Sequence, residues 1–73
     1  MKLNNAKAFG KAVRIYRKKQ GITQLQMAAV ANTGLRFISD LENGKPSIQL
    51  DKALRVAWLL GIRPEVEVPG DEK

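Results

Sequence analysis

The charged side chains of this sequence are suited to ionic binding and not to catalysis. The chain has no cysteine and no histidine, which excludes a thiol nucleophile, a disulfide framework and a histidine-based metal or acid–base site. Asp40 and Glu42 are two residues apart, so on a helix they point about 200° away from each other and form no pair of catalytic carboxylates. The sequence therefore predicts a protein that is not an enzyme and that needs no metal or cofactor.

Positive charge is concentrated in the first 60 residues. They hold eleven Lys and Arg against three acidic residues, whereas residues 61–73 hold two basic residues against four acidic ones. A basic body of this kind favours a polyanion as partner, because neutralising phosphates releases counterions and so supplies binding free energy. The alternative is a lysine-rich surface that serves only solubility, and charge alone does not separate the two.

Hydrophobic periodicity predicts four helices in this basic body. They are expected over about residues 6–19, 24–31, 35–42 and 48–60. Thr23 and Ser47 are placed to cap the second and fourth helices, and Gly44 to end the third. Asn32 is one of the few residues that tolerates the left-handed backbone of a tight turn, so the second and third helices form a compact pair.

Two of these helices carry residues that do not fit a simple core face. On the first helix, four basic residues share a face that is expected to be a solvated stripe, with direct contact to a ligand as the alternative: Lys7, Lys11, Arg14 and Lys18. On the fourth helix, the apolar face is expected to consist of Leu50, Ala53, Leu54, Ala57 and Leu60. Trp58 lies at the edge of that face, where it serves as core or contacts a partner. Leu59 falls among charged residues and is expected at an interface.

After Gly61 the apolar period changes from that of a helix to that of a strand. The alternating apolar positions are Ile62, Pro64, Val66 and Val68. No other segment shows a strand pattern, so the same strand of a second copy is the expected partner. This predicts a homodimer closed by a two-stranded sheet, with an interface formed by Trp58, Leu59, Ile62, Val66 and Val68. A tail without regular structure is the alternative.

A short helix held across another in a basic domain has the size to enter the major groove of DNA. Residues 14–47, RIYRKKQGITQLQMAAVANTGLRFISDLENGKPS, resemble the helix-turn-helix domain of the phage repressor and Cro class, also called Xre-type. The matching positions are Gly21, Thr23, Gln24, Ile38, Ser39, Glu42, Gly44 and Lys45. With the continuation to residue 68, the chain resembles the HipB-type antitoxins, in which a strand follows the fourth helix. Asn32 and Gly34 depart from the pattern, which usually has Gly and Ser or Thr there.

The resemblance implies a DNA-binding role for a set of residues around the third helix. They are Gln24, Thr33, Gly34, Leu35, Arg36, Ser39, Asp40, Asn43 and Lys45. Arg36 would donate two hydrogen bonds to a guanine, Leu35 would meet a thymine methyl group and Asp40 would accept from a cytosine amino group. Gln24 would contact a phosphate or a base, and Ser39 a phosphate. For each of them the alternative is a side chain that is merely exposed or, for Gln24, a helix cap.

Other positions have structural roles by the same resemblance. Arg17 and Glu42 would form a salt bridge between the first and third helices. Thr33 would cap the third helix where Gly34 lacks a side chain, and Phe37 would pack between the inner and outer faces of that helix.

The resemblance implies an all-α, lambda-repressor-like fold of four helices over residues 1–60, with a strand and acidic tail over 61–73 that pairs across a homodimer. It implies a cytoplasmic bacterial repressor that binds the operator DNA of its own operon and, as an antitoxin, a HipA-like serine/threonine kinase. A stand-alone phage- or plasmid-type regulator is the alternative within this class. A protein-binding module without a DNA function is the alternative of another class. No membrane role is expected, because no apolar run approaches the length of a span.

Overall fold

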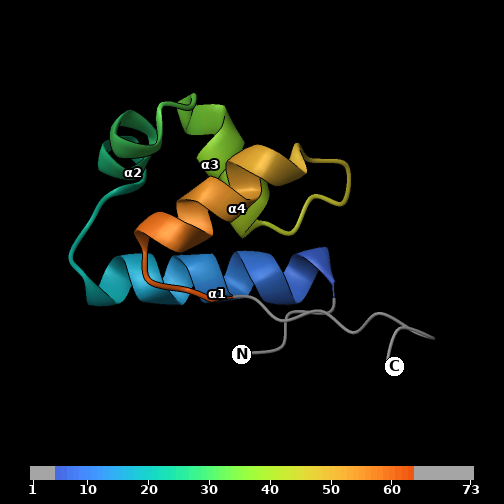
Figure 1. Ribbon diagram of the computed structural model, residues 1–73, viewed down its shortest axis with the longest axis horizontal. Helices are drawn as coiled ribbons and strands as arrows, with labels where there is room; N and C mark the ends of the chain where they lie inside the picture. Colours follow the sequence, from blue (N-terminus) through green and yellow to red (C-terminus); the bar gives the residue numbers. More distant parts are fainter. Residues whose placement is uncertain (1–4, 64–73) are drawn as a thin grey trace, which may run out of the picture.

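The computed structural model describes residues 5–63, which form a bundle of four helices (Figure 1). The helices are α1 (Ala6–Lys19), α2 (Gln24–Ala31), α3 (Leu35–Glu42) and α4 (Leu50–Leu59). In Figure 1, α1 runs along the bottom, α2 and α3 lie at the top and α4 lies in front. The all-α fold of four helices is confirmed. The described residues contain no strand, and the strand expected up to residue 68 lies outside them except for its first two positions. None of the helices in residues 5–63 has the length and apolar character to cross a membrane.

The first two helices begin where polar side chains can accept their free N–H groups. Asn5 Oδ1 accepts the N–H of Ala8 at 2.8 Å at the start of α1. At the start of α2, Thr23 Oγ1 accepts the N–H of Gln26 at 3.0 Å, and Gln26 Oε1 accepts the N–H of Thr23 at 2.8 Å, which completes a capping box. The third helix follows the left-handed Asn32, with φ 58° and ψ 50°, as the sequence predicts.

The helix ends turn the chain sharply back onto the core. Gly44 has φ +78°, and the N–H of Lys45 donates to the carbonyl of Asp40 at 3.0 Å, a Schellman arrangement. The end of α4 repeats it: Gly61 has φ +87° and the N–H of Ile62 donates to the carbonyl of Ala57 at 2.9 Å. This turn directs the Ile62 side chain into the core, where it is only 1% exposed.

The core is built from all four helices and from the residue that follows α4. Its largest fully buried side chains are Met27, Ile38, Ile62, Val13 and Val56. Close packing of α1 on α3 depends on Gly10, because a Cβ atom there would overlap the backbone carbonyl oxygen of Leu41 and press on that of Glu42. The backbone of α1 therefore lies directly against the last turn of α3.

The expected bounds and buried face of α4 need correction. The helix begins at Leu50 with Gln49 at its N-cap, and not at Ile48 after a Ser47 cap, because Ile48 packs half-buried against the core before the helix starts. The buried residues of the helix are Ala53, Val56 and Ala57. Leu50 and Leu54 were expected to face inward, but they are 65% and 42% exposed. The core-facing side of α4 is thus rotated away from these two leucines.

Candidate nucleic-acid interface

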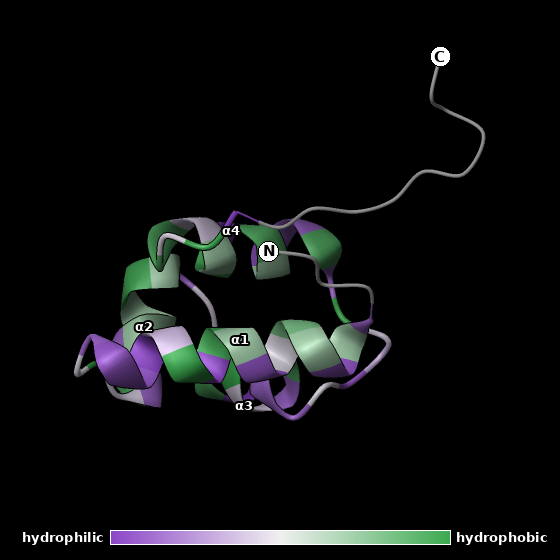
Figure 2. Ribbon diagram, turned by 90° about the horizontal axis from the view of Figure 1, so that it is seen from below, coloured by the Kyte–Doolittle hydropathy of each residue, from purple (hydrophilic) through white to green (hydrophobic). Residues whose placement is uncertain are grey.

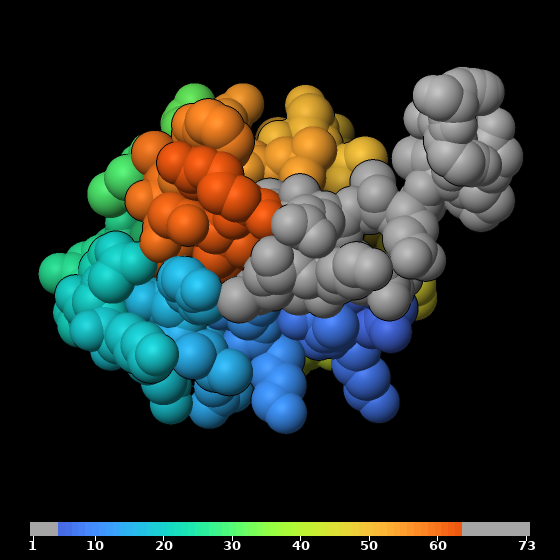
Figure 3. Space-filling model, turned by 60° about the horizontal axis from the view of Figure 1, so that its bottom comes forward, coloured from blue at the N-terminus to red at the C-terminus, as the bar shows by residue number. Residues whose placement is uncertain are grey.

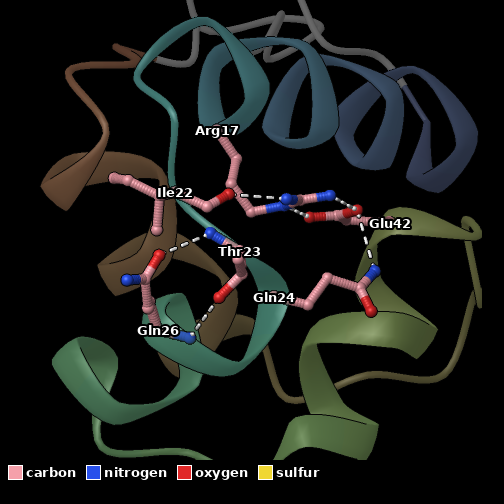
Figure 4. Close-up of polar contacts among 6 residues, drawn as sticks. All are labelled: Arg17, Ile22, Thr23, Gln24, Gln26 and Glu42. Carbon is pink, nitrogen blue, oxygen red and sulfur yellow. Dashed lines mark hydrogen bonds and ion pairs between the residues drawn. The ribbon is translucent and has the colours of Figure 1, made fainter.

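A buried polar cluster joins α1, the start of α2 and the end of α3 (Figure 4). Arg17 Nε donates to Glu42 Oε2 at 2.5 Å and Arg17 Nη2 to Glu42 Oε1 at 3.0 Å. Arg17 Nη1 donates to the carbonyl of Ile22 at 2.7 Å, and Gln24 Nε2 donates to Glu42 Oε1 at 3.0 Å. The two charged side chains are 8% and 1% exposed. A bidentate pair with further hydrogen bonds fixes the relative position of the three helices.

The electrostatics of this cluster follow from its hydrogen bonds. The hydrogen bond to Glu42 raises the pKa of Arg17 above its ordinary value, the attraction of the carboxylate adds to this, and burial opposes both. Arg17 is therefore a permanent cation, and it neutralises the carboxylate at the end of α3. For an anionic ligand that approaches α3, Glu42 adds little repulsion.

The outer face of α3 carries the side chains that were expected to reach base edges. Leu35 is exposed, and the Arg36 side chain is 89% exposed. Asp40 Oδ2 lies 3.9 Å from Arg36 Nε and 3.6 Å from Lys45 Nζ, so this carboxylate is shared between two basic side chains. Exposed pairs of this kind are weak, so a stronger ligand can displace them. Phe37 packs against the core.

The ends of α3 differ from each other. At its start, Gly34 has extended backbone and no side chain caps the helix. The Thr33 hydroxyl donates to the carbonyl of Gly34 at 3.3 Å and so does not cap α3 as expected. Asn43 and Lys45 lie exposed beyond the last turn. No side chain at the N-cap position therefore accepts a hydrogen bond from the first-turn N–H groups of α3.

The structure places four of the expected DNA-binding residues at two positions along α3. Arg36, Asp40 and Lys45 form one group on its outer surface. Gln24 belongs to the other, at the ion pair of the last turn, and its amide is not a helix cap because Thr23 has that role. No set of three carboxylates that could hold a metal ion occurs within residues 5–63.

The expected partner-binding residues are divided by the structure. Trp58 is 62% exposed, so the interpretation of this side chain as core is wrong, and the Arg63 guanidinium lies 3.8 Å from the centre of its ring. Leu59 is exposed as expected. Ile62 is buried within the protomer and offers no surface to a partner. Val66 and Val68 lie outside the described residues.

An exposed apolar surface on α4 was missed from the sequence. Leu50, Leu54 and Trp58 are spaced by four residues and are all exposed, so they form one row along the helix, called here the α4 apolar row. The spacing alone could have indicated the row. Leucines on the flank of an apolar face were instead assigned to the core.

Comparison with known proteins agrees with this arrangement. A family model described as "Helix-turn-helix" matches residues 13–66. The chain is 47% identical over 64 residues to a Sinorhizobium fredii protein named "Uncharacterized HTH-type transcriptional regulator y4mF", a match that covers 88% of this chain and 84% of that protein. It is 54% identical over 35 residues to the "Competence pilus inhibition repressor" of Acinetobacter baylyi, which covers 48% of this chain but only 32% of the repressor.

Proposed function

Because the chain belongs to the helix-turn-helix family of Xre-type transcriptional regulators, we propose that it is a sequence-specific DNA-binding repressor of transcription. The observation that carries this proposal is the outer face of α3. It presents an almost fully exposed Arg36 on a helix whose far end is held by the buried pair of Arg17 and Glu42. A short, exposed and rigidly supported helix in a basic protein is suited to the major groove of B-DNA.

In this proposal α3 reads base edges. Arg36 donates two hydrogen bonds to a guanine, and Leu35 meets a thymine methyl group. Asp40 lies 3.9 Å from Arg36 in the free protein and accepts from a cytosine amino group in the complex. Each good bidentate contact contributes about 1–3 kcal/mol of discrimination against a wrong base pair.

Residues at both ends of α3 bind the DNA backbone in the same proposal. Ser39, Asn43 and Lys45 contact phosphates near the end of the helix, and Gln24 does so at the start of α2. Thr33 and Gly34 bring the uncapped first turn of α3 close to the duplex, where free N–H groups meet negative charge. These contacts set the register of α3 in the groove.

We further propose that the repressor acts as a homodimer. The α4 apolar row supports this, because contiguous apolar surface on a small protein is typical of an interaction site. Trp58 and Leu59 contribute to the interface, together with a strand that contains Val66 and Val68. Two-fold symmetry would place the two copies of α3 in successive major grooves, about 34–36 Å apart on a palindromic site.

The similarity to HipB-type antitoxins supports a more specific role. In it, the dimer represses its own operon and binds a HipA-like serine/threonine kinase. The stand-alone regulator fits the same fold and the same relatives. Binding of the purified protein to a purified HipA-like kinase encoded beside its gene would support the antitoxin role. If the operon encodes no such kinase, or if the kinase does not bind, the stand-alone regulator is favoured.

The experiment that tests the proposed function is DNA binding across a salt series. The purified protein is titrated onto the duplex that lies upstream of its own gene and onto a scrambled duplex of the same length. The proposal expects tighter binding to the natural duplex by about 10³ or more and a steep dependence on salt. Equal and weak binding to both duplexes would contradict it and would favour a protein-binding module instead.

A further inference from the structure

A row of basic side chains runs along α1 and is not part of the proposed α3 interface. The residues of this basic stripe are Lys7, Lys11, Arg14 and Lys18, and all four are exposed. At 3.6 residues a turn they fall within about 60° of arc and extend for about 16 Å along the helix. Figure 3 shows long side chains of α1, in blue, projecting from the lower edge of the molecule.

The basic stripe borders α3. Gly10 and Arg17 mark the line along which α1 meets α3. On the helix surface the stripe begins about 40° from that line at Arg14 and reaches about 100° from it at Lys11. At one end, the Lys7 backbone is so close to the turn after α3 that a Cβ atom on Gly44 would lie 2.9 Å from its Cα atom. In Figure 2, where α1 lies in front, α3 and α4 appear on opposite sides of it. The stripe therefore starts next to the turn that carries Lys45 and follows the α3 side of the molecule.

The charges of the basic stripe are not neutralised by the described part of the chain. The acidic residues among 5–63 are Asp40, Glu42 and Asp51. Glu42 pairs with Arg17, and Asp40 lies between Arg36 and Lys45. Within these residues no carboxylate forms an ion pair with a stripe residue. Like charges three and four residues apart on a helix repel one another, and a row of phosphates would relieve this repulsion.

We propose that the basic stripe binds the phosphates of one DNA strand beside the groove that α3 enters. The four charges of the stripe extend for about 16 Å along α1, which is long enough to face several successive phosphates of one strand. The stripe supplies affinity and no base preference, because it contacts the backbone alone. This inference rests on the proposed function, since it needs α3 to lie on DNA.

A matched pair of variants tests the stripe. Lys18→Gln removes a stripe charge, and Lys19→Gln removes a neighbouring charge about 100° further round α1, away from α3. Both lysines are exposed in the last turn of the helix, so the two variants change net charge and the helix end alike. Binding to the upstream duplex and to the scrambled duplex is measured for each variant from 0.05 to about 0.3 M salt, where counterion release dominates.

Lys18→Gln is expected to make the fall of the logarithm of the binding constant with log salt shallower, by about 0.9 in slope. It is also expected to weaken binding to both duplexes by about five- to tenfold at 0.1 M salt. Adding Lys11→Gln lowers the slope by about 0.9 again, and Lys19→Gln leaves it unchanged. Equal slopes for the Lys18 and Lys19 variants, or a loss confined to the upstream duplex, would overturn the stripe. If the unmodified protein bound the upstream and scrambled duplexes equally, the proposed function itself would be overturned. The two failures are therefore distinguishable.

Discussion

Arg17 and Glu42 form a two-point ion pair that ties the middle of the fold to the helix proposed to read DNA. The guanidinium comes from α1 and the carboxylate from the last turn of α3, and both are almost completely buried. Because the same carboxylate also accepts from Gln24, it links the two helices of the tight pair to α1. The position of α3 therefore depends on the buried carboxylate of Glu42.

Glu42→Gln is expected to destabilise the protein strongly. The substitution keeps a hydrogen-bond acceptor but leaves the buried Arg17 without its counter-charge, and breaking a buried pair from one side typically costs about 3–5 kcal/mol. That is a large part of the stability of so small a domain. Urea unfolding followed by circular dichroism measures the change.

The matched control for this prediction is Asp51→Asn, which removes an exposed carboxylate at the start of α4. It is expected to change the free energy of unfolding by about 0.5 kcal/mol or less. If the Glu42 and Asp51 variants unfolded at the same urea concentration, the pair would have no structural role. Replacing both members, as Arg17→Met with Glu42→Leu, should recover much of the lost stability, because no unpaired charge then remains.

Gly10→Ala is expected to destabilise the protein although alanine is the better helix former. Alanine is favoured over glycine in a helix interior by about 1 kcal/mol, but a Cβ atom here would overlap the Leu41 carbonyl oxygen and force α1 away from α3. Overpacking of this kind costs about 1–3 kcal/mol. Thermal unfolding of the variant gives the sign of the effect.

Gly34→Ala serves as the comparison, because a Cβ atom at Gly34 meets nothing within 4 Å and the backbone there is extended. Only a small effect is expected, because the reduced backbone entropy of the unfolded chain is offset by the poorer preference of alanine for an N-cap position. A Gly10 variant as stable as the Gly34 variant would mean that α1 and α3 can separate without loss.

The local structure was predictable because single side chains determine it. Thr23 with Gln26 forms the capping box of α2, Asn32 supplies the left-handed turn and Gly44 ends α3, all within a few residues of chain. Such signals depend only on the types of a few neighbouring residues, which are read directly from the sequence. The bounds of α2 and the end of α3 follow from them.

The packing of α4 was not predictable in the same way. Leu50 and Leu54 lie on the flank of an apolar face, and only the packing of α4 against the other helices decides which flank is covered. Ile62 was assigned to a strand because the period of two begins there, yet the Schellman turn at Gly61 directs it inward. Each depends on contacts between distant segments, which an apolar pattern does not specify.

Cutting the chain after Arg63 is expected to weaken dimerisation while leaving the helices intact. The proposed strand lies beyond this point, whereas Ile62 and the Schellman turn that buries it are kept. Sedimentation at micromolar concentration compares the full chain with residues 1–63, and circular dichroism checks that helicity is preserved. A truncated protein that dimerises as strongly as the full chain would exclude the strand from the interface and leave the α4 apolar row as its basis.

Arg36→Ala is expected to abolish the preference for one base pair of the operator without changing stability. The side chain is 89% exposed, and its one ion pair within residues 5–63 is a long contact with Asp40, so the described fold loses little by its removal. A lost bidentate contact to guanine should cost about 1–3 kcal/mol at that position, which is roughly tenfold or more in affinity.

Arg36→Lys is the informative companion, because lysine keeps the charge but cannot donate through a planar fork. It should retain the salt dependence and lose the base preference. Binding to a series of duplexes that differ by one base pair measures both, and an unchanged preference profile in the alanine variant would show that α3 reads its site without Arg36.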